Sequence, residues 1–403
     1  MKQVTVIGAG ASGMAAAIAA ARAGACVTIL EKKEQPGKKL MLTGNGRCNF
    51  TNAVMEPSCY YGNDPAFIER FLRSFGTEEA LAFFESIGIL YSERNGYYYP
   101  NHMQASGVTS ALLSELKKLN VQIITNCNVR KLKREENGNF MIMTSAGEFK
   151  ADRVILACGS EAGVKDPNAF SAYEMLKNAG HSVYEIRPAL TCLTGSEGYE
   201  SFWNGVRVNG CVSYGNRKEN GEIQLTAEGI SGIAVFQLSR EVIREVVSSG
   251  RADVTLDLLP DHDIKELQSR IRKAAFKPAD SAETAEELLS GWIHKKLIRI
   301  VLKKASIDPK KLLTALTDDE QEDLVKALKS FEYRVTGYGD LLKSQTVQGG
   351  VDTREITERF ESIRIPGLYI TGELLDVDGI CGGYNLHFAW GSGLAAGKAA
   401  AET

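Results

Sequence analysis

Six residues near the N-terminus have the spacing of a phosphate-binding turn. Gly8-Ala9-Gly10-Ala11-Ser12-Gly13 has the pattern G-x-G-x-x-G and lies between an apolar strand, Val4–Ile7, and an alanine-rich helix. In this context Gly8 permits the tight turn, Gly10 lets a pyrophosphate approach the backbone, and Gly13 lets helix and strand pack closely. The free N–H groups and the dipole of the helix attract phosphates. The pattern therefore predicts a dinucleotide site on a βαβ unit.

The adenosine half of a dinucleotide needs a hydrogen-bond acceptor for its ribose. Glu31 stands at the end of the second apolar strand, Cys26–Leu30, eighteen residues after Gly13. A carboxylate at this place in a βαβ unit can accept hydrogen bonds from ribose hydroxyls. The alternative is a solvated acidic residue at a strand end. Because the glycine pattern precedes it, we interpret Glu31 as the ribose partner.

Three later segments favour FAD over NAD as the dinucleotide. Arg153–Gly159 forms a strand and a turn similar to the A-T-G signature of FAD domains, with Cys158 in place of threonine. Gly367–Glu373 is similar to the strand and G-D turn whose acid holds the ribityl chain, here with glutamate. Gly382-Gly383-Tyr384-Asn385 opens a helix of small residues, Leu386–Ala401. The N–H groups of that helix could face the flavin pyrimidine edge, where negative charge accumulates on reduction.

The segment after the second strand supports a family resemblance. Lys39–Asn52 resembles the G-x-G-R-C-N-x-T-N signature of the BaiN/YhiN-like flavoproteins, a bacterial family often labelled aminoacetone-oxidase-like. Glu222–Gly232, Thr346–Val351 and Gly372–Asn385 resemble three further segments of this family, so the resemblance covers essentially the whole chain. It implies an FAD domain interrupted by a β-barrel-like and helical insert, and a redox activity on a small organic substrate.

The predicted cofactor site combines the glycine turn, the acidic strand end, the signature segment and the C-terminal turn. Its residues are Gly8, Gly10, Ala11, Ser12, Gly13, Glu31, Lys32, Lys39, Leu40, Thr43, Gly44, Asn45, Arg47, Cys48, Asn49, Val129, Ala157, Cys158, Gly159, Gly372, Glu373, Asp378, Gly382, Gly383, Tyr384, Asn385 and Leu386. No metal site is predicted.

His387 and Cys48 could take part in chemistry beside the flavin. His387, four positions after Gly383, is a candidate catalytic proton donor or acceptor, with a packing role on a buried helix as the alternative. The family usually has threonine at the position of Cys381 and often glutamine at that of His387. The next cysteine after Cys48 is Cys59, which disfavours the cysteine pair of a disulfide reductase. We interpret Cys48 as a small residue in a tight loop, with a reactive thiol as the alternative.

Three further segments have more than one interpretation. Arg47 is interpreted as a cofactor or loop-anchoring residue, with binding of an anionic substrate as the alternative. Tyr97-Tyr98-Tyr99-Pro100 could line a substrate site or form an aromatic β run at a domain boundary. Lys131–Glu136 is a mixed charge run, which we interpret as solvated surface.

Composition limits the possible location and partners. The formal net charge is −3 at pH 7, which gives no electrostatic footprint for nucleic acid or an anionic membrane. Met14–Ala25 is too short to span a bilayer and contains Arg22. Room for a signal peptide is lacking before Val4, and the eight cysteines have no C-x-x-C spacing. We expect a cytoplasmic protein with reduced thiols and a small-molecule substrate; the oligomeric state stays open.

The order of elements predicts an interrupted domain. Strands and helices alternate from residue 1 to 188 and return from 345 to 403, which indicates one α/β, Rossmann-type FAD-binding domain made from both ends. Short β-like runs over 189–260 predict an inserted β-rich, barrel-like domain, and charged helical stretches over 261–344 predict an inserted helical domain. At 403 residues, two or three domains are expected.

These predictions describe an FAD-dependent oxidoreductase in which flavin N5 exchanges hydride with a small organic substrate. Oxidation of an amine and reduction of an unsaturated ketone or ring compound both stay open. No second G-x-G-x-x-G follows a strand, so NAD(P)H, if it is the electron donor, would bind transiently. The alternatives are a non-catalytic FAD-binding redox sensor and an FAD-dependent RNA-modifying enzyme.

Overall fold

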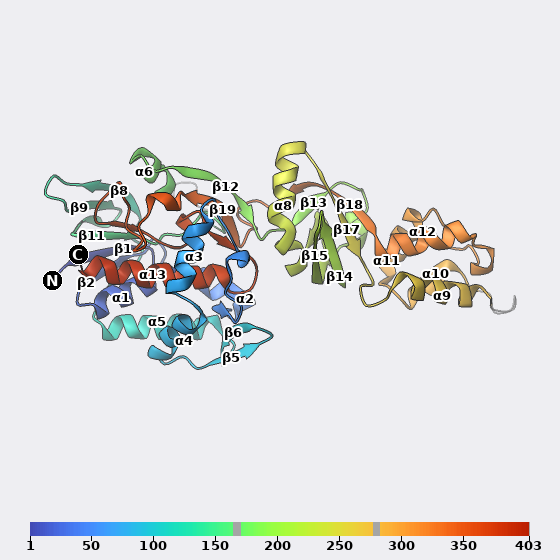
Figure 1. Cartoon of the computed structure of the whole chain (residues 1–403), viewed down its shortest axis with the longest axis horizontal. Helices are drawn as coiled ribbons and strands as arrows, with labels where there is room; N and C mark the ends of the chain where they lie inside the picture. The colour runs from blue at the N-terminus through green and yellow to red at the C-terminus, as the bar shows by residue number, and fades with distance from the viewer. Residues whose placement is uncertain (164–170, 277–282, 403) are drawn as a thin grey trace. The chain divides into compact units, whose positions relative to one another are not determined.

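The structure, a computed structural model, describes residues 1–163, 171–276 and 283–402 and divides into two compact units. One unit combines Met1–Arg187 with Thr346–Thr403, and the other is Pro188–Gln345. Both chain termini lie in the first unit (Figure 1). The first unit is therefore assembled from the two ends of the chain, as the distribution of flavin-type patterns predicts.

A five-stranded parallel sheet in the order β20-β11-β1-β2-β7 organises the first unit. Its strands are β1 (Gln3–Ile7), β2 (Cys26–Leu30), β7 (Gln122–Ile124), β11 (Arg153–Leu156) and β20 (Leu368–Ile370). Almost all side chains of β1, β11 and β20 are buried, as expected for parallel strands covered on both faces. Because the strands are parallel, the turns that follow β1, β2, β11 and β20 meet at one edge of the sheet, where ligands bind in this architecture.

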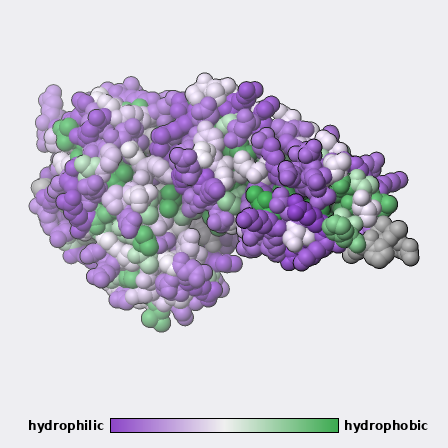
Figure 2. All heavy atoms as spheres, turned by 45° about the vertical axis from the view of Figure 1, so that its right-hand side comes forward, coloured by the Kyte–Doolittle hydropathy of each residue, from purple (hydrophilic) through white to green (hydrophobic). Residues whose placement is uncertain are grey.

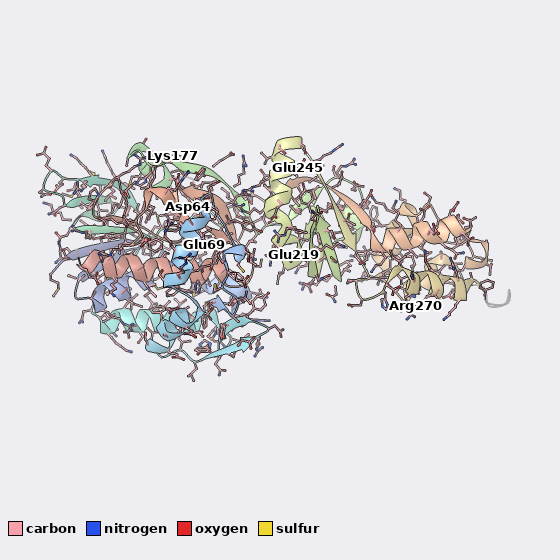
Figure 3. All side chains as sticks on the ribbon, viewed as in Figure 1. Asp64, Glu69, Lys177, Glu219, Glu245 and Arg270 are labelled. Atoms are coloured by element: carbon pink, nitrogen blue, oxygen red, sulfur yellow. The ribbon has the colours of Figure 1, made fainter. Side chains whose placement is uncertain are left out.

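Helices from distant parts of the sequence surround this sheet. Helix α1 (Ala11–Arg22) packs along the C-terminal helix α13 (Tyr384–Glu402) and also against α5 (Ala105–Lys118). The shorter helices are α2 (Thr43–Gly46), α3 (Pro65–Ser74), α4 (Thr77–Ser86) and α6 (Ala172–Asn178). Asp64, labelled in Figure 3, is the N-cap of α3. Its side chain accepts the N–H of Phe67 at 3.3 Å.

The described residues of the first unit also form four small sheets. Their strands are β10 (Gly147–Ala151), β9 (Phe140–Thr144) and β8 (Val129–Arg134); β3 (Thr51–Asn52), β6 (Tyr97–Pro100) and β5 (Tyr91–Arg94); β21 (Asp378–Gly379) with β4 (Tyr60–Tyr61); and β12 (Val183–Ala189) with β19 (Thr346–Val351). The aromatic run at residues 97–100 is therefore a β-strand.

The second unit contains a closed barrel in the order β13-β16-β15-β14-β17-β18. These strands are β13 (Leu193–Gly195), β14 (Val206–Tyr214), β15 (Arg217–Leu225), β16 (Gly229–Ser231), β17 (Ala252–Asp257) and β18 (Phe331–Tyr338). Helix α8 (Ile233–Ser249) packs against β14 and β15, and α7 (Glu200–Trp203) precedes β14. The barrel confirms the β-barrel-like part of the predicted fold.

Outside the barrel and its two helices, the described residues of the second unit form four further α-helices, and two of them start with a capping box. They are α9 (Ile264–Ala275), α10 (Ala285–Ser290), α11 (Lys295–Lys304) and α12 (Asp318–Lys329). Thr284 with Glu287 caps α10, and Thr317 with Glu320 caps α12, so local S/T-x-x-E chemistry sets both starts. α10 and α11 are separate helices, because α10 ends at Ser290 with Gly291 as its C-cap.

One strand of the barrel lies in the segment expected to be helical. β18 (Phe331–Tyr338) alternates buried and exposed residues and pairs with both β17 and β13. A hydrophobic core common to barrel and helices includes Leu256 of β17, Leu267 of α9 and Leu324 of α12. Separate folding of 189–260 and 261–344 stays a prediction.

Polar residues dominate the face of the molecule that Figure 2 shows, and hydrophobic residues occur there in small groups. Scattered apolar side chains of this kind are normal on a globular protein. Within the described ranges, no helix is both long enough and apolar enough to cross a membrane.

Candidate functional site

The glycine turn between β1 and α1 is packed against the neighbouring strand turn. Gly8 has a φ of +107°, and a Cβ atom there would lie 2.5 Å from the carbonyl oxygen of Ala157. A Cβ atom at Gly13 would lie 2.0 Å from the carbonyl oxygen of Gly8. Both positions exclude side chains, so these two glycines let strand, turn and helix come together, as the pattern predicts.

Gly10 differs from these two because the space above it is open. No described atom lies within 4 Å of a Cβ atom built at Gly10, and its φ of −83° suits any residue. Gly10 is the N-cap of α1, so the amides of Ala11, Ser12 and Gly13 have no acceptor within the helix. Open space beside free N–H groups at a helix N-terminus fits a pyrophosphate.

Glu31 lies across this turn, at the end of β2. Its side chain is largely buried, and the two oxygens accept the N–H groups of Ala9 at 2.7 Å and Lys33 at 2.8 Å. A carboxylate oxygen can accept more than one hydrogen bond, so capacity for ribose hydroxyls remains. The backbone carbonyl of Glu31 accepts the N–H of Cys127, two residues before Val129. The structure thereby brings Val129 and Lys32 to the expected adenosine end.

The signature segment forms a compact loop of unusual backbone conformation. Gly44, Asn45 and Cys48 have φ values of +56°, +55° and +58°, and the N–H of Cys48 donates to the carbonyl of Thr43. Thr43 in turn donates its hydroxyl to the carbonyl of the buried Leu40 at 2.6 Å. This loop orders the backbone between Lys39 and Asn49. Arg47 lies on its exposed side.

Asn49 presents an unsatisfied polar atom. Its side chain is largely buried, and Oδ1 has no hydrogen-bond partner among the described residues. The same atom would lie 3.0 Å from a Cβ atom at Gly383, at the start of α13. A buried amide oxygen without a donor is costly, so this atom fits a site that a polar ligand completes.

Burial keeps Cys48 and Cys158 protonated. Desolvation raises the pKa of the Cys48 thiol to about 12, although a hydrogen bond with Thr43 partly opposes the shift. Desolvation also raises the pKa of Cys158 to about 11. Because the thiolate is the nucleophile, the geometry favours a packing role for Cys48.

Glu373 joins four segments of the first unit. Its carboxylate accepts hydrogen bonds from Lys39 Nζ at 2.7 Å, Thr346 Oγ1 at 2.7 Å and Ser160 Oγ at 3.4 Å. Its backbone carbonyl accepts from the Tyr173 hydroxyl at 2.9 Å. Gly159 lies beside the carboxylate. Glu373 therefore stands where the turns after β11 and β20 meet the signature segment.

The C-terminal turn is fixed by side chains from the first hundred residues. Asn52 Nδ2 donates to the carbonyl of Gly382 at 3.0 Å, and the Tyr60 hydroxyl donates to the carbonyl of Tyr384 at 3.2 Å. Asn385 Oδ1 accepts the N–H of Gly379 at 2.9 Å, and Asn385 Nδ2 donates to the carbonyl of Gly379 at 2.8 Å. These contacts direct the N-terminus of α13 toward Asn49 and hold the turn before any ligand binds.

His387 occupies the core of the helix packing. It is fully buried, Nε2 donates to the carbonyl of Phe75 at 3.1 Å, and Nδ1 accepts from the Thr51 hydroxyl at 2.8 Å. Desolvation lowers its pKa to about 4, so the ring is neutral at pH 7. With both nitrogens engaged inside the protein, His387 suits the packing role and not that of a proton donor.

The remaining predicted residues lie in the turns after β11 and β20, in α13 and in β21. Gly372 and Ala157 are buried in the turns after β20 and β11, and Leu386 lies in the first turn of α13. Asp378 is buried in β21, where it pairs with Tyr61 of β4. Among the described residues, no group of three or more His, Cys, Asp or Glu side chains could hold a metal ion.

Sequence reasoning missed several residues that position the site. Thr346, Ser160 and Tyr173 surround Glu373, and Asn52 and Tyr60 hold the C-terminal turn. Thr346 and Asn52 belong to segments with family resemblance and could have been chosen. Ser160 and Tyr173 carry no local pattern, because only the fold brings them to Glu373.

Known proteins with similar sequences cover the whole chain. It is 41% identical over 412 residues to a 3-dehydro-bile acid delta(4,6)-reductase of Clostridium scindens, covering 100% of both proteins. It is 26% identical to a ribosomal RNA dihydrouridine synthase of Haemophilus influenzae, covering 97% of this chain and 96% of that protein. A ribosomal RNA dihydrouridine synthase of Escherichia coli is 28% identical, with 96% and 95% covered.

Solved structures support the fold. A 3-ketosteroid delta1-dehydrogenase from Sterolibacterium denitrificans matches with a TM-score of 0.55 and 11% identity, covering 100% of both chains. A 3-ketosteroid-delta4-(5alpha)-dehydrogenase from Rhodococcus jostii RHA1 matches with a TM-score of 0.50 and 18% identity, covering 100% of this chain and 97% of that one. At these identities the similarity concerns the fold alone.

The sheet edge, its glycine turn and these relatives define an FAD-dependent oxidoreductase with a Rossmann-type domain. The family described as HI0933-like protein Rossmann domain matches residues 2–399, and the chain belongs to it. This membership and the 41% identity confirm the BaiN/YhiN-like resemblance and FAD as the cofactor.

Proposed function

We propose that this enzyme reduces a carbon–carbon double bond conjugated to a ketone in a small polycyclic substrate of the steroid kind, with NAD(P)H as the electron donor. The observation that carries the proposal is the 41% identity, over the full length of both chains, to a 3-dehydro-bile acid delta(4,6)-reductase. When bound, FAD supplies hydride exchange with the organic substrate at its N5 atom.

Residues of the first unit have distinct proposed roles in holding FAD. The open space at Gly10 and the N-terminus of α1 would take the pyrophosphate, and Glu31 would accept from the adenosine ribose. Glu373 would accept from the ribityl chain while it holds Lys39 in place. The N-terminus of α13 and Asn49 Oδ1 would bind the polar edge of the flavin.

The same comparison separates the alternatives. Identity to the RNA-directed relatives is 26% and 28%, against 41% for the bile-acid reductase, which favours a small organic substrate over RNA. A non-catalytic sensor gains no support, because the three relatives named above are enzymes by description. Amine oxidation gains none either, since the most identical of them is a reductase.

Anaerobic reduction of the flavin tests the electron donor, and product analysis tests the substrate. Purified enzyme is mixed with NADH or NADPH without oxygen, and bleaching of the visible flavin absorbance is followed. Reduced enzyme is then offered 3-oxosteroids with a Δ4 or Δ4,6 unsaturation, and products are analysed by mass spectrometry. The proposal predicts bleaching by a nicotinamide, reoxidation by the enone, and a product heavier by two hydrogens per double bond.

Matched substrates make the result decisive. The corresponding saturated 3-oxosteroid should not reoxidise the flavin, because it offers no conjugated double bond. If no unsaturated ketone reoxidises the reduced enzyme but an amine bleaches the oxidised enzyme, the proposed direction of the reaction is wrong. Bleaching by neither nicotinamide would leave the organic donor to be found and would contradict the NAD(P)H part.

A further inference from the structure

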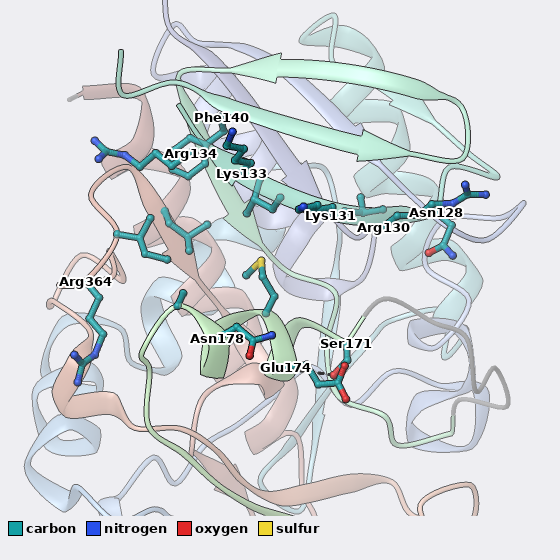
Figure 4. Close-up of a pocket in the computed structure, with 16 residues that line it drawn as sticks. Asn128, Arg130, Lys131, Lys133, Arg134, Phe140, Ser171, Glu174, Asn178 and Arg364 are labelled. Atoms are coloured by element: carbon teal, nitrogen blue, oxygen red, sulfur yellow. Dashed lines mark hydrogen bonds between the residues drawn. The ribbon is translucent and has the colours of Figure 1, made fainter. Parts of the chain in front are cut away.

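A groove in the first unit lies beside the small antiparallel sheet β10-β9-β8. It has a volume of about 790 Å³ and is lined by β8, by helix α6 and by the segment Arg364–Leu368 (Figure 4). Val129 is the one lining residue that also belongs to the predicted cofactor set. The volume is in the range of small-molecule sites.

The floor of the groove is apolar. Leu132, Phe140, Met175, Ile365 and Leu368 line it, and each of them is buried or half-buried. Such a floor gives an apolar ligand a surface on which it loses contact with water.

The rim of the groove is strongly basic. Arg130, Lys131, Lys133 and Arg134 line it from β8, are all exposed, and have no ion-pair partner among residues 1–163, 171–276 and 283–402. Arg364 also lines it but is already paired with Glu355 at 2.5 Å.

Among the described lining residues, Glu174 of α6 is the one carboxylate near these cations. Four uncompensated cations around one concavity attract anions. The sequence alone suggested a solvated surface for the run that starts at Lys131, but it did not show that these residues border an apolar cavity.

Protection of a sheet edge explains only part of this arrangement. β8 is an outer strand of its sheet, and lysines on such an edge prevent pairing with other chains. That role needs charge along the strand but no cavity, and it does not require the apolar side chains contributed by α6 and by residues 364–368.

We propose that this groove binds an amphipathic anion, a molecule with an apolar body and a carboxylate, sulfonate or phosphate group. The apolar body lies on Leu132, Met175 and Ile365, and the anionic group lies among the cations of β8. Apart from Val129, the lining residues lie outside the predicted cofactor set, and the proposal does not depend on the proposed steroid reduction.

Binding of 1-anilinonaphthalene-8-sulfonate to the FAD-loaded enzyme tests this site. Its neutral counterpart, N-phenyl-1-naphthylamine, has the same apolar body without the sulfonate. Fluorescence titration should show tighter binding of the sulfonate. The chain offers a matched pair of variants. Lys133 of β8 and Lys150 of β10 both pair with Met141 of β9, but of these two lysines only Lys133 lines the groove.

Lys133→Glu should weaken binding of the sulfonate about fivefold or more, whereas Lys150→Glu should change it less than about twofold. Neither variant should change binding of the neutral probe. Met175→Glu, which places a carboxylate on the floor, should weaken both probes. Decanoate should displace the sulfonate, but acetate and inorganic phosphate at the same concentration should not.

Several results would overturn the proposal. Equal weakening of sulfonate binding by Lys133→Glu and Lys150→Glu would mean that the net charge of the surface attracts the probe and that the groove does not bind it. Displacement by inorganic phosphate alone would remove the apolar requirement. Unchanged sulfonate binding in Met175→Glu would place the probe elsewhere. Loss of flavin absorbance in Lys133→Glu would assign the groove to the cofactor site, and steroid turnover is measured in parallel to keep the two proposals apart.

Discussion

Gly10 and Gly397 both lie next to helix α1, yet their surroundings are opposite. A Cβ atom at Gly10 would meet nothing within 4 Å, whereas one at Gly397 would lie 2.1 Å from the backbone carbonyl of Ala16. Gly393 is similarly closed, at 2.3 Å from the carbonyl of Ser12. Glycines on α13 therefore serve packing between helices, and the glycine at the start of α1 leaves room for a ligand. Substitutions at the two kinds of position should separate stability from cofactor binding.

The largest effect is expected on stability, from substitution of the closely packed Gly397. Gly397→Val should destabilise the first unit by about 3 kcal/mol or more, or prevent folding, because the backbone of α1 cannot move away cheaply. Urea unfolding, monitored by the release of flavin, measures the free energy of unfolding. Lys398→Val is the control, since this exposed neighbour gains the same β-branched side chain without a clash and should cost less than about 1 kcal/mol. Equal stability of both variants would mean that α1 and α13 are not in close contact.

At the open position, Gly10→Val should abolish FAD binding without changing the fold. The side chain meets no protein atom, so the apoprotein should lose no more than about 1 kcal/mol from the poorer N-cap. FAD affinity should fall by about a hundredfold or more, because the valine occupies the space proposed for the pyrophosphate. Calorimetric titration of apoprotein with FAD gives the affinity, and apoprotein melting gives the stability. Normal FAD affinity in this variant would exclude Gly10 from the site.

A smaller effect is expected where a ligand contact and a structural contact share one residue. Glu373→Ala removes a proposed ribityl partner and also the acceptor for Lys39 and Thr346. Loss of one charged hydrogen-bond partner should weaken FAD about tenfold in a folded protein. Glu358→Ala, at a largely exposed glutamate, should leave the affinity unchanged. Wild-type affinity in the folded Glu373 variant would show that this carboxylate serves only the protein.

The smallest effect concerns the thiol in the signature loop. Because burial raises the pKa of Cys48 to about 12, only a minute fraction is thiolate at pH 8, and raising the pH toward 12 is needed to form it. Iodoacetamide should label the exposed Cys26 of the native enzyme and leave Cys48 unlabelled until the protein unfolds. Peptide mapping by mass spectrometry distinguishes the two. Rapid labelling of Cys48 in native enzyme at pH 8 would restore the interpretation as a reactive thiol.

Local patterns allowed much of the fold to be predicted. The glycine turn, Glu31 and the strands β1, β2, β11 and β20 were found because each is set by a short run of residues. β18 was missed although its alternation of buried and exposed residues is a strand signal, since charged helical sequence precedes it. The closed glycines of α13 were recognised as small, but only the structure shows which neighbour each one meets.

The candidate site was less predictable, because its geometry depends on contacts between distant segments. Lys39 and Glu373 are separated by 334 positions, and Ser160 and Tyr173 reach the same glutamate from a further segment. His387 was placed correctly at the start of the last helix. Its neighbours Phe75 and Thr51 occupy both ring nitrogens, and no sequence rule would have revealed that.

The pairing of α1 with α13 also sets the order in which the newly made chain can fold. On the ribosome, α1 emerges roughly 360 residues before its partner helix. At about 5–20 residues per second, the apolar face of α1 waits some tens of seconds for α13. Residues 188–345, which form their own compact unit, are complete about 3–11 seconds before the end of α13 at the same rate. The middle of the chain can therefore fold while the first unit still lacks its last helix, and chaperones would be needed most by the end that is made first.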